Sequence, residues 1–163
     1  MAPPPAAATS PRGRIAALPY AGLHLRIVAF ILDVLVLMSF GMLFAAAAAG
    51  YLVIDSNLND GNLSDESPYV VAGLILAYIF AFVPLYHTLM WTWWGQTVGK
   101  MAVHVKVMSA KPGRLSFRRC ALRFLGYAFS VLPFFLGILM ALFDSERRML
   151  HDHLAGTVVV ELP

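Results

Sequence analysis

The sequence contains little charge and a single cysteine, and each shortage excludes a class of protein. Asp, Glu, Lys and Arg make up 13% of its 163 residues, whereas about a quarter of the residues in a soluble domain are charged. Hydrophobic residues make up 60% of the chain and the mean hydropathy is +0.72, so the composition predicts a membrane protein. Cys120 alone cannot form an internal disulfide, which excludes a disulfide-stapled secreted scaffold.

Charge is absent from three long stretches, residues 34–54, 67–99 and 124–143. Each reaches the length of about 20 residues that a helix needs to cross a bilayer. A helix also satisfies its own backbone hydrogen bonds in lipid. We therefore predict an all-α membrane protein with about three transmembrane segments. Pro133 and Gly137 interrupt the third, which is either a full crossing or a re-entrant pair of half-helices.

The beginning of the chain differs from the rest. Residues 1–19 are rich in proline and alanine and predict a disordered tail. A signal peptide is the alternative, but the charged leader is long and Asp33 interrupts the apolar stretch that follows. Residues 20–161 then form one membrane domain, since too little chain remains for a separate soluble core.

Residues 95–123 are basic and contain no acid. The sequence MAVHVKVM (101–108) partly alternates and AKPGR (110–114) is typical of a turn, so a short cytoplasmic β-hairpin is expected here. The later TVVVEL (157–162) has strand character and could pair with MAVHVKVM. The cations of the segment are Lys100, Lys106, Lys111, Arg114, Arg118, Arg119 and Arg123.

The distribution of Lys and Arg predicts the orientation. The N-terminal side of the first span carries Arg12, Arg14 and Arg26, and the basic segment follows the second span, while the loop at 55–68 has four acids and no cation. The positive-inside rule places the N-terminus and the basic segment in the cytoplasm. A full third crossing puts the C-terminal tail outside, and a re-entrant pair returns it to the cytoplasm.

Two ionisable residues lie on one stripe of the first span. Arg26 and Asp33 are almost two helical turns apart, with a rise of about 10 Å between them. Asp33 lies inside the apolar run, where an ionisable side chain indicates a functional site. Arg123 is a candidate counter-ion, and a desolvated Asp33 could exchange a proton or a small cation. A buried ion pair that only fixes helix register explains the same residues.

Two short motifs could carry chemistry. GQTVGK (95–100) lacks the spacing and the hydroxyl residue of a phosphate loop, so we interpret Gly95, Gln96, Gly99 and Lys100 as an interfacial turn with Lys100 near lipid phosphates. HDH (151–153) could ligate a metal. A helix cap, or an ion pair from Asp152 to Arg118 or Arg119, is favoured instead, and we predict no metal, no cofactor and no enzyme.

These blocks together resemble a known family. RIVAFILD (26–33), WGQTVGK (94–100), a basic segment ending in RF (123–124) and LHDHLAGTVVV (150–160) are similar to the RDD family of bacterial membrane proteins. Val98 departs from the proline that the family often has. The resemblance implies that Arg26, Asp33 and Asp152 are the named arginine and aspartates. It implies a multi-pass protein of the bacterial inner (plasma) membrane, in a family with some members linked to ion transport, including sodium–proton exchange.

Two functional hypotheses follow. In the first, Asp33 binds a proton or a monovalent cation such as sodium, Arg26 and Arg123 tune it, and Asp152 with His151 forms a relay; three short spans then require an oligomer. In the second, the protein is a scaffold or accessory subunit for a partner membrane protein, and Arg26, Asp33 and Asp152 are structural. The lipid bilayer and anionic lipids are the expected contacts, and nucleic-acid binding is not predicted.

Overall fold

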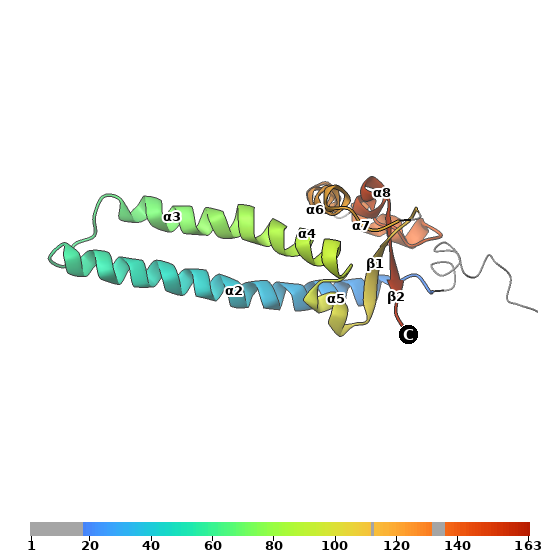
Figure 1. Ribbon diagram of the computed structural model, residues 1–163, viewed down its shortest axis with the longest axis horizontal. Helices are drawn as coiled ribbons and strands as arrows, with labels where there is room; N and C mark the ends of the chain where they lie inside the picture. Colours follow the sequence, from blue (N-terminus) through green and yellow to red (C-terminus); the bar gives the residue numbers. More distant parts are fainter. Residues whose placement is uncertain (1–17, 112, 132–135) are drawn as a thin grey trace, which may run out of the picture. The chain divides into compact units, whose positions relative to one another are not determined.

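A computed structural model of the chain describes residues 18–111, 113–131 and 136–163. The fold is mostly helical, with a small two-stranded sheet (Figure 1). It divides into two units. We call Val34–Tyr86 the helical pair, and we call the unit made of Met1–Asp33 and His87–Pro163 the terminal unit. Most of the tail predicted at residues 1–19, with Arg12 and Arg14, lies outside the described residues.

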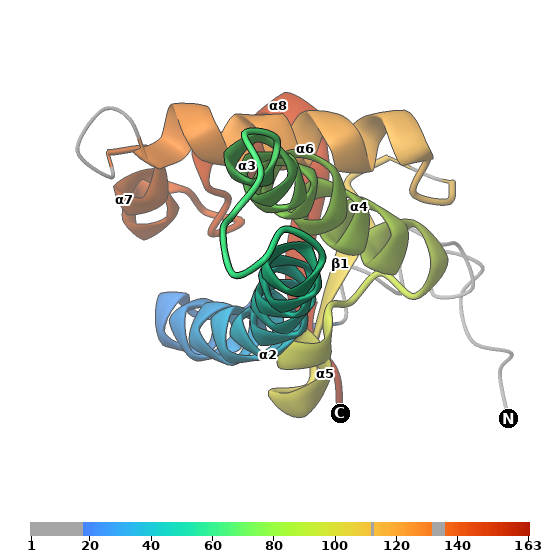
Figure 2. The ribbon, with the colours of Figure 1, turned by 90° about the vertical axis from the view of Figure 1, so that its left-hand side faces the viewer.

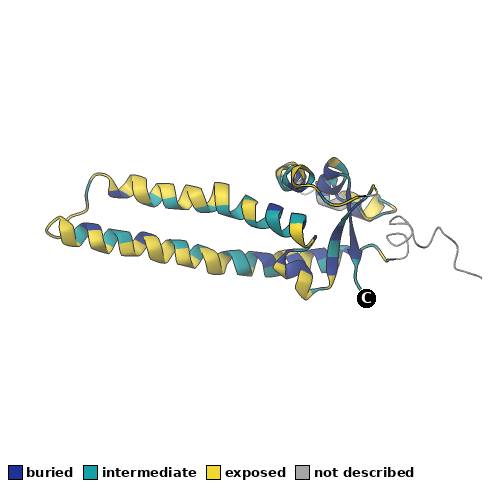
Figure 3. Ribbon diagram, viewed as in Figure 1, coloured by how far each residue is buried: buried dark blue, intermediate teal, exposed yellow. Residues whose placement is uncertain are grey.

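Two helical runs in the described chain are long and apolar enough to cross a bilayer. The first is helix α2 (Leu23–Leu58), and the second joins α3 (Ser67–Ala77), the π-helical turn η2 (Tyr78–Phe82) and α4 (Val83–Trp93). Most side chains of the helical pair are exposed (Figure 3), as expected for a surface that faces lipid. The charge-free part of α2, between Asp33 and Asp55, is about 33 Å long, close to the bilayer core of about 30 Å.

Aromatic side chains hold the helical pair together. The Phe44 ring lies 5.1 Å from the Tyr78 ring and 5.6 Å from the Phe82 ring, measured between centroids. The Tyr78 hydroxyl donates to the carbonyl of Leu37. Pro84 is the second residue after the π turn, and because proline has no N–H, a carbonyl in the preceding turn loses its usual helical donor. The disturbance expected at Pro84 thus coincides with the one π turn in the described chain.

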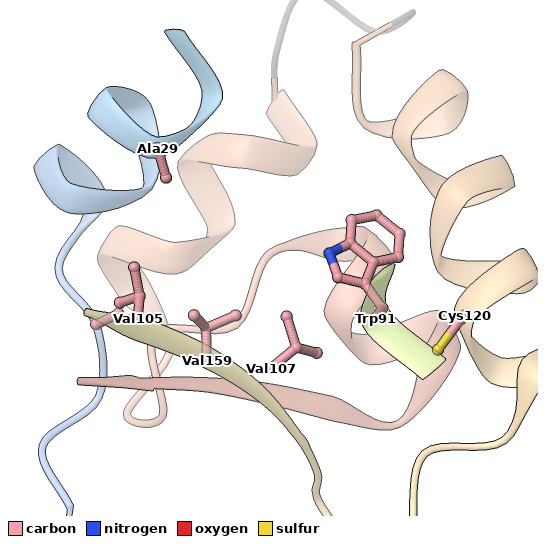
Figure 4. Packing of buried hydrophobic residues seen from close by; sticks show 7 residues of the cluster. Ala29, Trp91, Val105, Val107, Cys120 and Val159 are labelled. Carbon is pink, nitrogen blue, oxygen red and sulfur yellow. The ribbon is translucent and has the colours of Figure 1, made fainter. Parts of the chain in front are cut away.

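The sheet lies in the terminal unit. Strand β1 (Val105–Ser109) pairs antiparallel with β2 (Thr157–Glu161), with Val107 opposite Val159. Tyr20 forms a bridge to Val160 on the other edge of β2. Val105, Val107 and Val159 pack in one buried cluster with Trp91 and Cys120 (Figure 4).

The predicted pairing of TVVVEL with MAVHVKVM is therefore confirmed. The hairpin expected within residues 95–123 is wrong, because the partner of β1 comes from the end of the domain. The physical reason is burial. Alternate residues of β1 are buried and need an apolar neighbour, which the three valines of β2 supply and the polar residues after β1 do not.

The third predicted segment consists of two helices, α6 (Phe117–Val131) and α7 (Leu136–Phe143). Both are shorter than the length of about 20 residues that a crossing requires, so the count of three transmembrane segments is not confirmed. Helix α6 packs against the short helix α8 (Leu150–Ala155) (Figure 2). Pro133, which was expected to split the segment, lies outside the described residues, and Gly137 lies within α7.

Candidate functional site

A single carboxylate in the terminal unit lies between two arginines. Arg26, in the first turn of α2, donates from Nη1 to Asp152 Oδ2 over 2.7 Å. Arg123, on α6, forms a shorter salt bridge with Asp152 Oδ1. All three side chains are buried, with Asp152 fully so. Residues from the two ends of the chain and from its middle therefore meet at one carboxyl group.

The local fold of α8 places this carboxylate. Met149 is extended at the N-cap of the helix, and Asp152, at the third helical position, accepts the Met149 N–H over 3.1 Å. A helix N-terminus leaves such N–H groups without helical partners, so a carboxylate is favoured at this position. Gly156 then adopts a left-handed conformation with φ of 61° and leads directly into β2. The first residue of β2, Thr157, accepts from Arg123 Nη1 over 2.5 Å.

The electrostatics keep Asp152 ionised. Burial alone raises the pKa of this carboxyl, but the positive charges of Arg123 and Arg26 and the Met149 N–H together hold it well below its usual range. Two guanidinium groups thus share one buried negative charge. Removing that charge would leave both arginines uncompensated in the interior.

Asp33 is held by a second set of donors. Its Oδ2 accepts from the Thr97 hydroxyl over 2.5 Å and its Oδ1 accepts from the Gly99 N–H over 2.8 Å. The side chain is buried. Thr97 and Gly99 begin the short helix α5 (Val98–Ala102), so Asp33 caps α5 from a neighbouring helix.

Gly99 permits this close approach. A Cβ atom at position 99 would lie 2.1 Å from the carbonyl oxygen of Ala29 and 2.9 Å from Asp33 Cγ. Real Cβ atoms are never found so close to a backbone oxygen. The start of α5 therefore packs directly against the α2 backbone, and any side chain here would separate them.

Gly95 and Gln96, which lie between α4 and α5, form hydrogen bonds with β1. Gly95 has a positive φ of 71°, and its carbonyl accepts from the Val107 N–H over 2.7 Å. Gln96 donates from Nε2 to the carbonyl of Val105 over 3.1 Å. The motif at 95–100 is therefore a structural turn that fixes the ends of three elements.

Lys100 and Arg123 approach the buried ring of Trp91. Lys100 Nζ lies 5.4 Å from the ring centroid, and Arg123 Cζ lies 5.2 Å from it. Lys100 was expected near lipid phosphates, but only 6% of it is exposed. That expectation is wrong because the turn directs the side chain inward, where the indole face offers a cation–π contact.

His151 is buried beside the aspartate and is neutral. Burial is the main cause that lowers its pKa to about 3; Asp152 opposes this shift, while the charges of Arg123, Lys100 and Arg26 add to it. Its ring stacks on Tyr127 with centroids 4.0 Å apart. No group of three or more His, Cys, Asp or Glu side chains with the geometry of a metal site occurs in the described part of the chain.

The comparison with protein families now decides the relationship. The model of the RDD family matches residues 20–156, most of the chain. The protein belongs to the RDD family. It is also 34% identical over 89 residues to an uncharacterised protein, RP437, of Rickettsia prowazekii (strain Madrid E). That match covers 54% of this chain and 49% of the relative, so the chain spans about half the length of the curated relative it matches. No solved structure matches.

Arg26, Asp33 and Asp152, which the resemblance implies as the named arginine and aspartates, do not form one contact group. Arg26 and Asp152 bind each other, whereas Asp33 binds the turn at 97–99. The suggested pairing of Arg123 with Asp33 is not what the salt bridges show, because Arg123 pairs with Asp152. Arg118 and Arg119 were suggested as partners of Asp152, but Arg119 donates to Ser109 Oγ over 2.6 Å.

Sequence reasoning missed Thr97, Thr157 and Trp91 as parts of the site. Thr97 stood within the quoted GQTVGK motif, and a hydroxyl between two glycines is a recognisable donor for a buried acid. Thr157 and Trp91 carried no such signal. Their roles depend on which helices meet, and a local pattern does not encode that.

Proposed function

We propose that this RDD protein is a membrane-embedded scaffold in which Arg26, Asp33 and Asp152 hold the terminal unit together. One observation carries the proposal: each carboxylate oxygen of Asp33 and Asp152 accepts a hydrogen bond or ion pair from the protein itself. A monovalent cation would need those oxygens as ligands. Two adjacent arginines also make the surroundings of Asp152 unfavourable for a second cation.

The contacts of Asp33 and Asp152 connect segments that are distant in the sequence. The salt bridges of Asp152 join α2, α6 and α8, and the hydrogen bonds of Asp33 join α2 to α5. A scaffold needs this rigidity because its partner must meet a defined surface. The exposed apolar side chains of the helical pair offer that surface within the bilayer, either to another membrane protein or to a second copy.

The sheet supports a proposal for the membrane topology. Tyr20 precedes α2, β1 follows α4 and α5, and β2 is the last element, yet all three lie side by side. We infer that α2 and the α3–α4 run cross the membrane as a hairpin, with every other segment on one side. The basic residues of 95–123 support a cytoplasmic location for that side, at the inner membrane of a bacterial cell.

In this arrangement the third segment does not cross. Helix α6 exposes Phe117, Leu122, Leu125 and Phe129 while it buries Cys120, Arg123 and Gly126. A short helix with one exposed apolar face is suited to lie in the plane of the membrane interface. The C-terminal tail then stays with the N-terminus.

Transport remains the competing proposal, since Asp33 directly precedes the charge-free stretch of a helix of spanning length. The test is flux in liposomes that contain purified full-length protein, under proton and sodium gradients. A scaffold gives no flux above empty vesicles, and Asp33→Asn lowers thermal stability. Flux in the wild type that disappears in a well-folded Asp33→Asn variant would overturn the scaffold and establish Asp33 as a transport residue.

A further inference from the structure

A groove of about 410 Å³ lies in the terminal unit, and Arg26, Asp33 and Asp152 do not line it. The last turn of α4, strand β1 and the loop after it form its walls. We call it the tryptophan–lysine groove after five of its lining residues. They are Trp93, Trp94, Lys106, Lys111 and Arg114.

The groove carries uncompensated positive charge. Among the described salt bridges, none involves Lys106, Lys111 or Arg114. No Asp or Glu lines the groove, and residues 95–123 contain none at all. Three cations around one groove of this size repel one another, and an anionic ligand would remove that repulsion.

The two tryptophans place the groove at a particular depth. Trp93 and Trp94 are 66% and 51% exposed, and their rings meet edge to face with centroids 5.5 Å apart. They stand at the end of a helical run long enough to span a bilayer. Exposed tryptophans at such a position are typical of the membrane–water interface, where an indole ring contacts both headgroups and acyl chains.

We propose that the tryptophan–lysine groove binds the headgroup of an anionic phospholipid. The cations contact the phosphate, and the indole rings contact the glycerol and the first acyl carbons. A zwitterionic lipid fits less well because its own ammonium group meets the same cations. Free phosphate would use the charges but not the exposed rings. The proposal depends on α4 ending at the membrane surface, as inferred above.

The test uses full-length protein in a mild detergent, with bound lipid counted by native mass spectrometry. Phosphatidylglycerol and phosphatidylcholine are the two probes. We expect phosphatidylglycerol to bind more tightly, and Arg114→Gln to weaken it about fivefold, the usual effect of one cation near an anionic lipid surface. Arg118→Gln is the matched control, since Arg118 is an exposed cation of the same segment that does not line the groove.

Three outcomes would overturn the inference. The two lipids bind equally to the wild type; the two variants lose the same affinity; or millimolar inorganic phosphate displaces phosphatidylglycerol. The wild-type preference alone tests the proposal if Arg114→Gln fails to fold. A negative result here leaves the scaffold proposal intact, because that proposal is tested by flux and by the stability of Asp33→Asn.

Discussion

Asp152 is one carboxylate shared by two buried guanidinium groups. We therefore expect its substitution to destabilise the protein more than any other substitution in the site. Asp152→Asn keeps the shape of the side chain but removes the charge that both Arg26 and Arg123 require. Breaking a buried ion pair at one partner costs about 3–5 kcal/mol. We expect a loss of that order in the free energy of unfolding, measured in detergent with a chemical denaturant.

Asp144→Asn is the control for that measurement. Asp144 also pairs with an arginine, Arg148, but both side chains are partly exposed, and solvent screens such pairs so that they contribute little. If the two variants lost equal stability, the burial of Asp152 would not be the cause of its importance.

The low pKa of His151 makes the stability of the protein depend on pH. Its pKa is lowered from 6.5 to about 3, so between these values the unfolded chain binds a proton that the folded protein excludes. Stability is therefore fully present above pH 6.5 and falls as the pH drops towards 3, by at most about 1.4 kcal/mol per pH unit for this one proton.

Thermal unfolding between pH 4 and 7 measures that slope. We expect it to be smaller in His151→Gln, because the substituted residue does not titrate. An unchanged slope in the variant would show that other groups account for the acid sensitivity.

At the scale of elements, α5 can pack against α2 only because Gly99 has no side chain. Gly99→Ala forces a methyl group to 2.1 Å from the carbonyl oxygen of Ala29, so α5 must move away and both hydrogen bonds of Asp33 weaken. Overpacking of this kind costs about 1–3 kcal/mol, occasionally more. The readout is the melting temperature of the purified protein.

Gly73→Ala is the matched variant, since a Cβ atom at this helical position meets nothing within 4 Å. Alanine favours helix over glycine, so this change should leave the melting temperature unchanged or slightly raised. Similar losses at both positions would contradict a special role for the contact at Gly99.

Elements differ in how far the sequence predicts them. The two long helices were predictable because a charge-free run of about 20 residues leaves few alternatives in lipid. The strand pair was predictable from the valines of TVVVEL. The partner of Arg123 was not, because Arg123 faces Asp152 only once α6 has packed on α8. The sequence thus identifies which charged residues lie in apolar surroundings, whereas tertiary packing determines which of them form ion pairs.

For the whole molecule, the sheet predicts one side of the membrane for both ends. Single cysteines introduced as Asn62→Cys, in the loop between α2 and α3, and as Pro163→Cys test this with a membrane-impermeant maleimide. The native Cys120 is buried and should not react in the folded protein. We expect Asn62→Cys to label from outside intact cells and Pro163→Cys only after the membrane is opened. Labelling of both positions from outside intact cells would contradict this topology and support a third transmembrane crossing.

Strand β2 is translated after every other described element, yet it supplies half of the sheet, a bridge to Tyr20 and the Thr157 acceptor for Arg123. In the proposed topology the helical hairpin can enter the bilayer early, but the sheet and the hydrogen bond from Arg123 to Thr157 cannot form until these five residues emerge from the ribosome. A nascent chain shortened before position 157 would thus be inserted but open, and a cell's membrane proteases would be expected to recognise it.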